Sequence, residues 1–333
     1  MSTYPEHQRL RQEIRRSVAP LTGVYRLIDP YDQALYIGKS VNLRARLLSH
    51  FRGGSGTLAY GVRTFETRET QTELMALLLE DTLIKRELPR HNTRQAELVD
   101  FRYLILTNDP YPTCLAVEEA RPDSSEVFGP VRGKYFAAEI IEVVNRTLGL
   151  RACADRHPFR RSANYDLGFC SGPCRGAIPE VAYQEIVGRV IAFLRGDDTE
   201  VALRLQLAIA SQAEALAFER CAELERVLGR CRRFCVRQRF IEKFRDGALL
   251  LFDDGEGFCY EFAAGRLVGV QHVAKGASSP TSFPQELSEP MADPRALLDR
   301  AAIVHGWIEQ HPETCRVETR GLETPARYGH DCS

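Results

Sequence analysis

Two short runs of β-branched and aromatic residues near the N-terminus constrain the fold of this chain more than any other feature. The runs are GVYRLI (23–28) and ALYIG (34–38), and the turn-forming segment DPYDQ separates them. Strands this short, joined by so few residues, are typical of a β-hairpin. The second run leads into Gly-Lys-Ser, as in nucleotide-binding loops, but such loops need a glycine where this chain has Gln33. The sequence therefore predicts a hairpin and no nucleotide-binding loop.

The segments around the hairpin alternate between helical and strand-like patterns. Apolar residues recur at helical spacing after the hairpin, where Asn42 is a plausible N-cap, and again in a long run that Pro89 stops. Residues 1–100 are therefore predicted to form a domain in which helices flank a small antiparallel sheet. Its expected elements besides the hairpin are a charged helix in 1–18, helix 42–51, strand 62–67 and helix 70–88.

The rest of the chain divides into three further segments by the same reasoning. The middle segment has two strands around a turn at 108–110, then helix 137–150 and a cysteine-bearing loop. The last segment has three β-like stretches, a Ser/Pro-rich linker at 277–290 and helix 294–310. The fold class is mixed α+β. The three segments are a middle domain at 101–180, a long helical arm at 181–244 and a small β-containing region at 245–333.

Charge is distributed unevenly although the net formal charge is only −1. Residues 1–100 carry a net charge of +3 and 145–245 carry +6, whereas 246–333 carry −7. The two basic segments can meet a polyanion and the acidic tail cannot. The sequence has neither an apolar run long enough to span a membrane nor a secretory signal. We expect a cytoplasmic protein with no membrane partner.

Several polar residues near the hairpin stand where chemistry is expected. Arg46 and His50 are four residues apart and therefore share one face of helix 42–51. Glu80 lies inside the apolar run LMALLLEDTLI, where a carboxylate costs several kcal/mol unless a cation or hydrogen bonds offset its burial. Glu80 on the rim of an ordinary core is the alternative interpretation. Lys39 follows the second strand directly.

These residues together resemble the GIY-YIG nuclease domain. The resemblance rests on GVY and YIG, followed in order by Lys39, Arg46, His50, Glu80 and the asparagine of PRHN. LLLEDTLIKRELPRHN is especially similar to the branch of that family formed by the UvrC excinucleases. FGPVRGKYFAAEIIEVVNRTLGLRAC and FCSGPCRGAI continue the similarity, which extends over about residues 5–240. The resemblance implies a metal-dependent DNA endonuclease of nucleotide excision repair.

The resemblance also implies a role for each residue of the site. Glu80 would hold one Mg²⁺ or Mn²⁺, and Arg46 would neutralise the scissile phosphate. Tyr25 would be the general base, acidified by Lys39 and the metal, and Gly38 would let the substrate approach the backbone. Tyr36 and His50 would orient water or phosphate, although many UvrC sequences carry tyrosine where this chain has His50, which leaves the identity of the base open. The other implied contacts with DNA are made by Asn92, Lys39, Arg44 and Arg52.

The cysteines of the loop at 151–178 form a separate candidate site. UvrC-like proteins carry four cysteines here, consistent with an iron–sulfur cluster. Three match in this chain, Cys153, Cys170 and Cys174, while Ser162 stands at the fourth position. His157 could complete a set that suits zinc as well as a cluster. The alternative is a loop without metal that packing holds together.

The arm and the last segment indicate partners and limits. ALAFERCAELERVLGRC resembles the motif through which UvrC-type proteins meet UvrB, and an ordinary helical arm or a DNA contact by the basic run GRCRRFCVRQRF is the alternative. Residues after 245 resemble at most the opening strands of the second, RNase H-like nuclease of UvrC. The chain thus looks like the short Cho form, which cuts damaged double-stranded DNA 3′ of a lesion after UvrA and UvrB act. A non-catalytic adaptor that binds UvrB or DNA is the alternative function.

Overall fold

The computed structural model describes residues 5–52, 57–92, 101–119, 126–153, 163–274, 277–290 and 294–320. The chain forms two compact units. The first combines Met1–Arg94 with Lys243–Ser333, and the second is Gln95–Glu242. The first and last of the four expected segments therefore belong to one unit, and the middle segment and most of the arm belong to the other.

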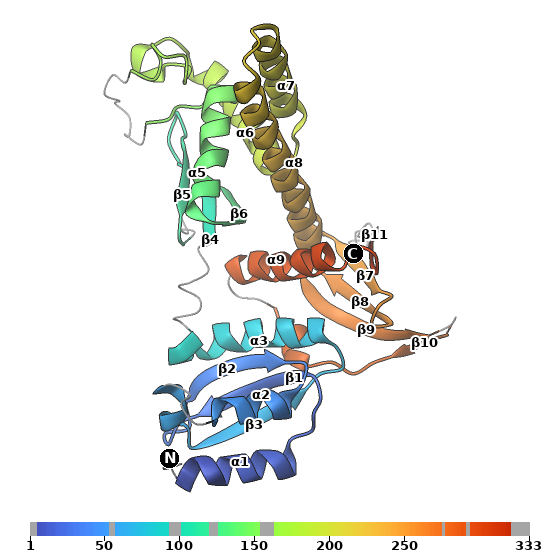
Figure 1. The fold of residues 1–333 in the computed structure, drawn as a ribbon. Coiled ribbons are helices and arrows are strands. Elements are labelled where there is room, and N and C mark those ends of the chain that lie inside the picture. Colours follow the sequence, from blue (N-terminus) through green and yellow to red (C-terminus); the bar gives the residue numbers. More distant parts are fainter. Residues whose placement is uncertain are drawn as a thin grey trace, which may run out of the picture. The chain divides into compact units, whose positions relative to one another are not determined.

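The N-terminal part of the first unit is a three-stranded antiparallel sheet with the order β2-β1-β3. Leu10 and Ile14 of α1 are buried together with Leu43 and Leu47 of α2 in one core, to which Tyr25 of β1 belongs. Figure 1 shows α3 on the opposite side of the sheet from α1. The elements are α1 (Pro5–Ser17), β1 (Gly23–Ile28), β2 (Ala34–Ser40), α2 (Leu43–His50), β3 (Thr64–Glu69) and α3 (Glu73–Glu87).

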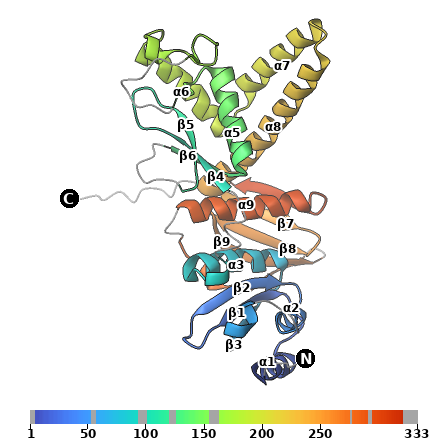
Figure 2. The same ribbon diagram turned by 60° about the vertical axis from the view of Figure 1, so that its left-hand side comes forward.

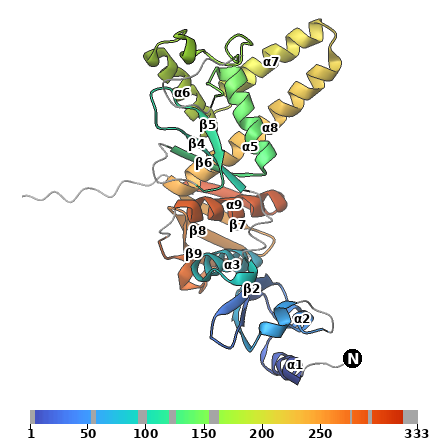
Figure 3. The ribbon, with the colours of Figure 1, turned by 90° about the vertical axis from the view of Figure 1, so that its left-hand side faces the viewer.

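The C-terminal part of the first unit is an antiparallel sheet with the order β10-β9-β8-β7-β11. Helix α9 lies across this sheet, above α3 in the view of Figure 3, and it contacts α3. Asp253 is buried at the end of β7, where it accepts hydrogen bonds from the Trp307 indole and from the Gly255 amide and so holds a turn. The elements are β7 (Ala248–Asp253), β8 (Phe258–Ala263), β9 (Arg266–Ala274), β10 (Ala277–Pro280), α9 (Pro294–Gln310) and β11 (Cys315–Arg320).

The second unit joins a three-stranded sheet, order β5-β4-β6, to a group of helices around one core. Tyr183 and Phe193 of α6 and Cys235 of α8 are buried in that core with Ile140 of α5. Figure 2 shows α7 and α8 side by side, extending away from α5. The elements are β4 (Phe101–Leu106), β5 (Cys114–Val117), β6 (Glu126–Arg132), α5 (Lys134–Val143), α6 (Glu180–Leu194), α7 (Thr199–Glu214) and α8 (Phe218–Asp246), whose last turn lies in the first unit.

The elements that were predicted from the regular spacing of apolar side chains agree with this structure. The hairpin is confirmed, Asn42 caps α2 as predicted, and helix 294–310 has the bounds of α9. The long arm is interrupted because Leu216 adopts a left-handed backbone with φ 56°. Three strands were not predicted: β6, β11, and β10, which occupies part of the expected linker. Edge strands such as β10 and β11 are held by backbone pairing and need no distinctive side-chain pattern. Within the described ranges, no helix is long and apolar enough to cross a membrane.

Candidate active site

The register of the β1–β2 hairpin places two tyrosines on one face of the sheet. Tyr25 lies opposite Gly38, and Leu27 lies opposite Tyr36. Because side chains alternate between faces along a strand, both rings point to the same side, with centroids 6.0 Å apart. A Cβ atom at position 38 would lie 2.6 Å from the Tyr25 hydroxyl oxygen and 2.8 Å from Cε1 of Tyr36. Glycine is required here because the tyrosine rings cover its backbone, which corrects the expectation that Gly38 makes room for the substrate.

Helix α2 brings a cation and an imidazole to these rings. The Tyr25 hydroxyl lies 2.8 Å from Nε2 of His50, and Nε of Arg46 donates to the same hydroxyl at 3.3 Å. Arg46 is also hydrogen-bonded to Tyr36, whose ring centroid is 5.8 Å from that of His50. The structure thus brings together four of the predicted residues, and the spacing of Arg46 and His50 on one helix face is the reason both reach the tyrosines.

Burial and the nearby charges determine the protonation states of Tyr25 and His50. Tyr25 has no exposed surface, and burial raises its pKa well above the usual value, with Tyr36 adding to the rise and Arg46 opposing it. Burial, and then the charge of Arg46, lower the pKa of His50 to about 4. At neutral pH the phenol is therefore protonated and the imidazole neutral, so the Tyr25 hydroxyl donates to Nε2 of His50 and accepts from Arg46.

The ammonium group of Lys39 lies elsewhere than expected. Its Nζ forms an ion pair with Glu73, in the first turn of α3. The expectation that Lys39 acidifies Tyr25 is wrong for this arrangement, because the pKa of Tyr25 is raised and the Lys39 charge is paired. The expected phosphate contact of Lys39 likewise requires its ammonium to exchange Glu73 for the phosphate.

Glu80 lies at the outer edge of β2, the edge strand of the sheet. Its Oε1 accepts a hydrogen bond from the backbone amide of Lys39 at 2.8 Å. Burial raises the pKa of the Glu80 carboxyl, and the Lys39 amide is the main opposing influence. A carboxylate that is partly desolvated and uses one oxygen for a backbone amide keeps Oε2 for another ligand.

Asn92 holds the same edge of β2. Its Oδ1 accepts from the Ile37 amide at 2.8 Å, and its Nδ2 donates to the Ile37 carbonyl at 2.7 Å. The side chain is 3% exposed, so both ends of the amide are engaged away from solvent. The expectation that Asn92 contacts a phosphate is corrected: it closes the open edge of β2, whose unpaired backbone groups would otherwise lack partners.

The two arginines predicted to contact DNA differ in their surroundings. Nε of Arg44 donates to the Val18 carbonyl at 2.6 Å, which ties α2 to the end of α1. Arg52 follows α2 and is exposed. Their contact with DNA stays a prediction.

The donor set near Glu80 fits one kind of metal ion. Among the described residues, no group of three or more His, Cys, Asp and Glu side chains is arranged to hold a metal. Glu80 therefore offers a single carboxylate, beside Arg46 and the two tyrosines. Mg²⁺ is commonly bound by one or two carboxylates and keeps several of its waters, so these residues fit a hydrated Mg²⁺ or Mn²⁺ and do not fit a closed zinc site.

The cysteine loop lies in the second unit, and two residues of the predicted set, His157 and Ser162, are outside the described residues. Burial raises the pKa of Cys170, and the thiols of Cys153 and Cys174 raise it further, so the three cysteines share one neighbourhood. Because the described part of the chain contains no three-ligand group, the expected cluster or zinc has no support there.

Sequence reasoning missed one residue that shapes the site. Glu73 pairs with Lys39, and the only signal in the sequence is that an acidic residue is favoured in the first turn of a helix. That preference explains why Glu73 is tolerated there and does not identify its partner, which the packing of α3 on the sheet decides.

Comparison with known proteins matches two parts of the chain to family models. Residues 21–93 match the UvrC-like GIY-YIG domain, and 101–193 match the UvrC/Cho excinuclease middle domain. The UvrABC system protein C of Chlorobium luteolum is 28% identical over 284 residues, which are 78% of this chain and 45% of that protein. Its counterpart in Latilactobacillus sakei is 34% identical over 208 residues, 61% of this chain and 35% of the relative. The chain thus spans less than half the length of these relatives.

One group of solved structures is also similar. The GIY-YIG N-terminal endonuclease domain of UvrC from Thermotoga maritima, bound to magnesium as its catalytic divalent cation, is 30% identical. The match covers 24% of this chain and 97% of that domain, with a TM-score of 0.23. A tyrosine-to-phenylalanine point mutant of the same domain is 29% identical over 26% of this chain and 96% of that domain, with the same TM-score.

Proposed function

The chain belongs to the UvrC family of GIY-YIG endonucleases, and from this premise we propose that it is a metal-dependent DNA endonuclease of nucleotide excision repair. We propose that it hydrolyses one phosphodiester on the 3′ side of a lesion in UvrB-bound double-stranded DNA. The observation that carries the proposal is the convergence of Tyr25, Arg46 and His50 in one hydrogen-bonded group beside the carboxylate of Glu80. A non-catalytic protein that only binds UvrB or DNA would not need a buried phenol, an imidazole and a cation in contact.

The chain's own residues supply most of what phosphodiester hydrolysis needs. Arg46 is exposed and cationic, so it can neutralise charge on the phosphate while its Nε holds the Tyr25 hydroxyl. Glu80 would hold the divalent cation through Oε2, because Oε1 is engaged by the Lys39 amide. When bound, that cation stabilises the developing negative charge on the leaving 3′-oxygen.

The burial of the tyrosines separates their roles. Tyr25 has no exposed surface and is held between Arg46 and His50. We therefore propose that it positions these two side chains, in place of the general-base role that the sequence led us to expect. Tyr36 keeps a small exposed edge and is hydrogen-bonded by Arg46. We therefore assign orientation of the attacking water to Tyr36: the water oxygen attacks phosphorus, the bond from phosphorus to the 3′-oxygen breaks, and the departing 3′-oxygen takes up the proton that the water loses.

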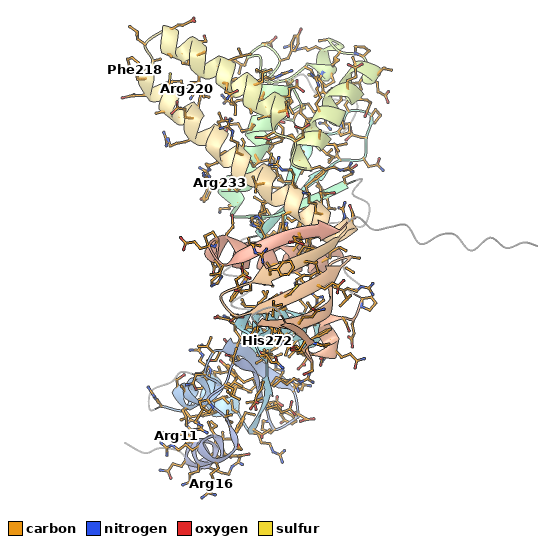
Figure 4. The ribbon with its side chains drawn as sticks, turned by 90° about the vertical axis from the view of Figure 1, so that its right-hand side faces the viewer. Arg11, Arg16, Phe218, Arg220, Arg233 and His272 are labelled. Atoms are coloured by element: carbon orange, nitrogen blue, oxygen red, sulfur yellow. The ribbon has the colours of Figure 1, made fainter. Side chains whose placement is uncertain are left out.

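The arm supports a protein partner. Figure 4 shows Phe218 and Arg220 at the turn that joins α7 and α8, with Arg233 further along α8. Leu216 and Phe218 are 71% and 68% exposed, so this turn presents an apolar surface that the unit itself does not cover. We propose that UvrB docks at this turn, with Phe218→Ala expected to weaken co-purification with UvrB and Val236→Ala, elsewhere on α8, to leave it unchanged.

Nicking of a duplex with one defined lesion, in the presence of UvrA and UvrB, tests the function. We expect a single cut 3′ of the lesion, dependent on Mg²⁺ or Mn²⁺. Glu80→Gln should still bind DNA and cut it at least about 10²–10³-fold more slowly. Cuts on both sides would contradict a single nuclease centre. Binding without any cut by the wild-type protein would favour the adaptor.

A further inference from the structure

Residues 248–320 lie outside both family-model matches, and the contacts that their described part makes with the N-terminal part of the unit are mostly with one element, helix α3. That helix carries Glu80. Its buried side chains cover about 200° of the helix circumference at 3.6 residues per turn, which is more than a narrow stripe. They are Leu74, Met75, Ala76, Leu78, Leu79 and Leu83. An apolar face this wide needs partners on more than one side, so the nuclease sheet alone does not complete its environment.

The first contact between the two parts is at the start of α3. The N-cap Thr72 accepts from the Met75 amide at 3.2 Å and is also hydrogen-bonded to Tyr260, which is fully buried in the C-terminal sheet. Glu256 accepts from the Glu73 amide at 3.4 Å, one of the helix-start amides that have no partner within the helix. A carboxylate at this position also interacts favourably with the helix dipole.

The second contact lies directly beyond Glu80. Arg300 of α9 is 2% exposed; its Nη2 donates to the Thr82 hydroxyl and its Nη1 to the Leu287 carbonyl, both at 3.0 Å. Lys85 pairs at 2.9 Å with Asp81 of its own helix and at 2.9 Å with Asp299 of α9. The ion pairs of Lys85 and the hydrogen bonds of Arg300 thus join α3 to α9.

The two contacts bracket Glu80 along a rigid element. Thr72 and Glu73 precede it by two turns, and Asp81, Thr82 and Lys85 follow it within about one and a half turns. Fixing a helix at two such places fixes its rotation and its height over β2. These are the variables that set the distance from Glu80 Oε1 to the Lys39 amide, which is 2.8 Å.

We propose that the C-terminal region is a clamp that sets the position of Glu80 on the edge of β2, with Arg300 and Thr82 as its positioning residues. The importance of this position for a divalent cation rests on the proposed function; the positioning itself does not. Residues that orient a metal ligand typically affect metal affinity by about 10–100-fold when removed.

Two backbone amides of β2 provide a direct test with an internal control. The Lys39 amide is held by Glu80 of α3, whereas the Ile37 amide, two residues away on the same edge, is held by Asn92 beyond the helix. Native-state amide hydrogen exchange of the full chain therefore reports separately on the two partners. In Arg300→Met and in Thr82→Val we expect exchange at Lys39 to become about tenfold faster, on the order of one lost hydrogen bond, with Ile37 unchanged.

Three variants decide between positioning and general stability. Thr82→Ser keeps the hydroxyl that accepts from Arg300 and should exchange as the wild type does. Arg316→Met removes an exposed arginine of the same sheet that pairs with Asp254, and it should also leave Lys39 unchanged. Unchanged exchange at Lys39 in Thr82→Val, or equal acceleration at Lys39 and Ile37, overturns the clamp, and Thr82→Val keeps the test decisive if Arg300→Met does not fold.

A second readout links the clamp to the cation. Mn²⁺ titration of the DNA-free protein, followed by electron paramagnetic resonance, should show about tenfold weaker binding in Thr82→Val than in Thr82→Ser. If Mn²⁺ binding is the same in Glu80→Gln as in the wild type, the proposed metal role fails while the exchange result at Lys39 still stands. If Glu80→Gln loses Mn²⁺ and Thr82→Val does not weaken it, the clamp has no influence on the cation and the proposal is overturned.

Discussion

Substituting Gly38 by alanine should disrupt the tyrosine group at its base. The added Cβ would lie 2.6 Å from the Tyr25 hydroxyl oxygen, 2.7 Å from its Cζ and 2.8 Å from Cε1 of Tyr36. Relaxed contacts between such atoms are about 3.5 Å or longer, so the Tyr25 ring must retreat by about 1 Å. That movement is enough to break its bonds to His50 at 2.8 Å and to Arg46 at 3.3 Å.

The magnitudes follow from the same geometry. Overpacking in a close-packed core costs about 1–3 kcal/mol, which urea unfolding measures as a lower midpoint. A misplacement of about 1 Å in catalytic side chains costs on the order of 10²-fold in rate, which the nicking assay measures. Gly306→Ala is the matched control, because its added Cβ would meet no atom within 4 Å apart from its chain neighbours and the backbone of its own helix. Helix α9 should gain about 0.5–1 kcal/mol from the better helix former.

Two results would refute this reasoning. Wild-type stability and nicking in Gly38→Ala would show that the Tyr25 ring does not cover position 38. Additive effects of Gly38→Ala and Tyr25→Ala would show the same, since removal of the ring should relieve the clash and give a coupling energy of about 1–2 kcal/mol.

Three further outcomes are expected. Asn92→Ala should lower the free energy of unfolding by about 2–4 kcal/mol, because the amide and carbonyl of Ile37 lose their partners. Urea unfolding measures this change. Asn42→Ala is the comparison, because the loss of that N-cap should cost only about 1 kcal/mol. The pKa of His50 is about 4 in the folded chain and about 6.5 in the unfolded chain. Between these two pH values only the unfolded state takes up the proton, so the free energy of unfolding falls as the pH is lowered from about 6.5 to about 4. His50→Gln should reduce this dependence of stability on pH. Tyr36→Phe should reduce kcat on the order of 10²-fold or more with substrate affinity kept, which single-turnover nicking and a DNA-binding titration check together.

The sequence predicted those parts of the molecule whose signal is local. The period-2 runs around DPYDQ identify the hairpin, and the four-residue spacing of Arg46 and His50 places both on the face of α2 that meets Tyr25. Glu80 was detected because a carboxylate inside an apolar run needs a compensating partner.

What the sequence did not show depends on contacts between distant segments. Asn92 was expected at a phosphate, but both ends of its side-chain amide bond the backbone of Ile37 at the open edge of β2. Lys39 was expected beside Tyr25, but side chains alternate along β2, so Lys39 points to the α3 side and meets Glu73. The docking of α9 on α3 through Arg300 lies between residues more than two hundred positions apart, where periodicity carries no information.

The central claim is that the group around Glu80 cuts DNA, and a matched pair of proteins tests it most directly. Glu80→Gln keeps the oxygen that accepts from the Lys39 amide and removes only the charge, so its fold should match the wild type. Single-turnover nicking of a duplex with one defined lesion, with UvrA, UvrB and Mg²⁺, should give one 3′ cut with the wild type and a rate lower by at least about 10²–10³-fold with Glu80→Gln. Equal rates for the two proteins would contradict the account.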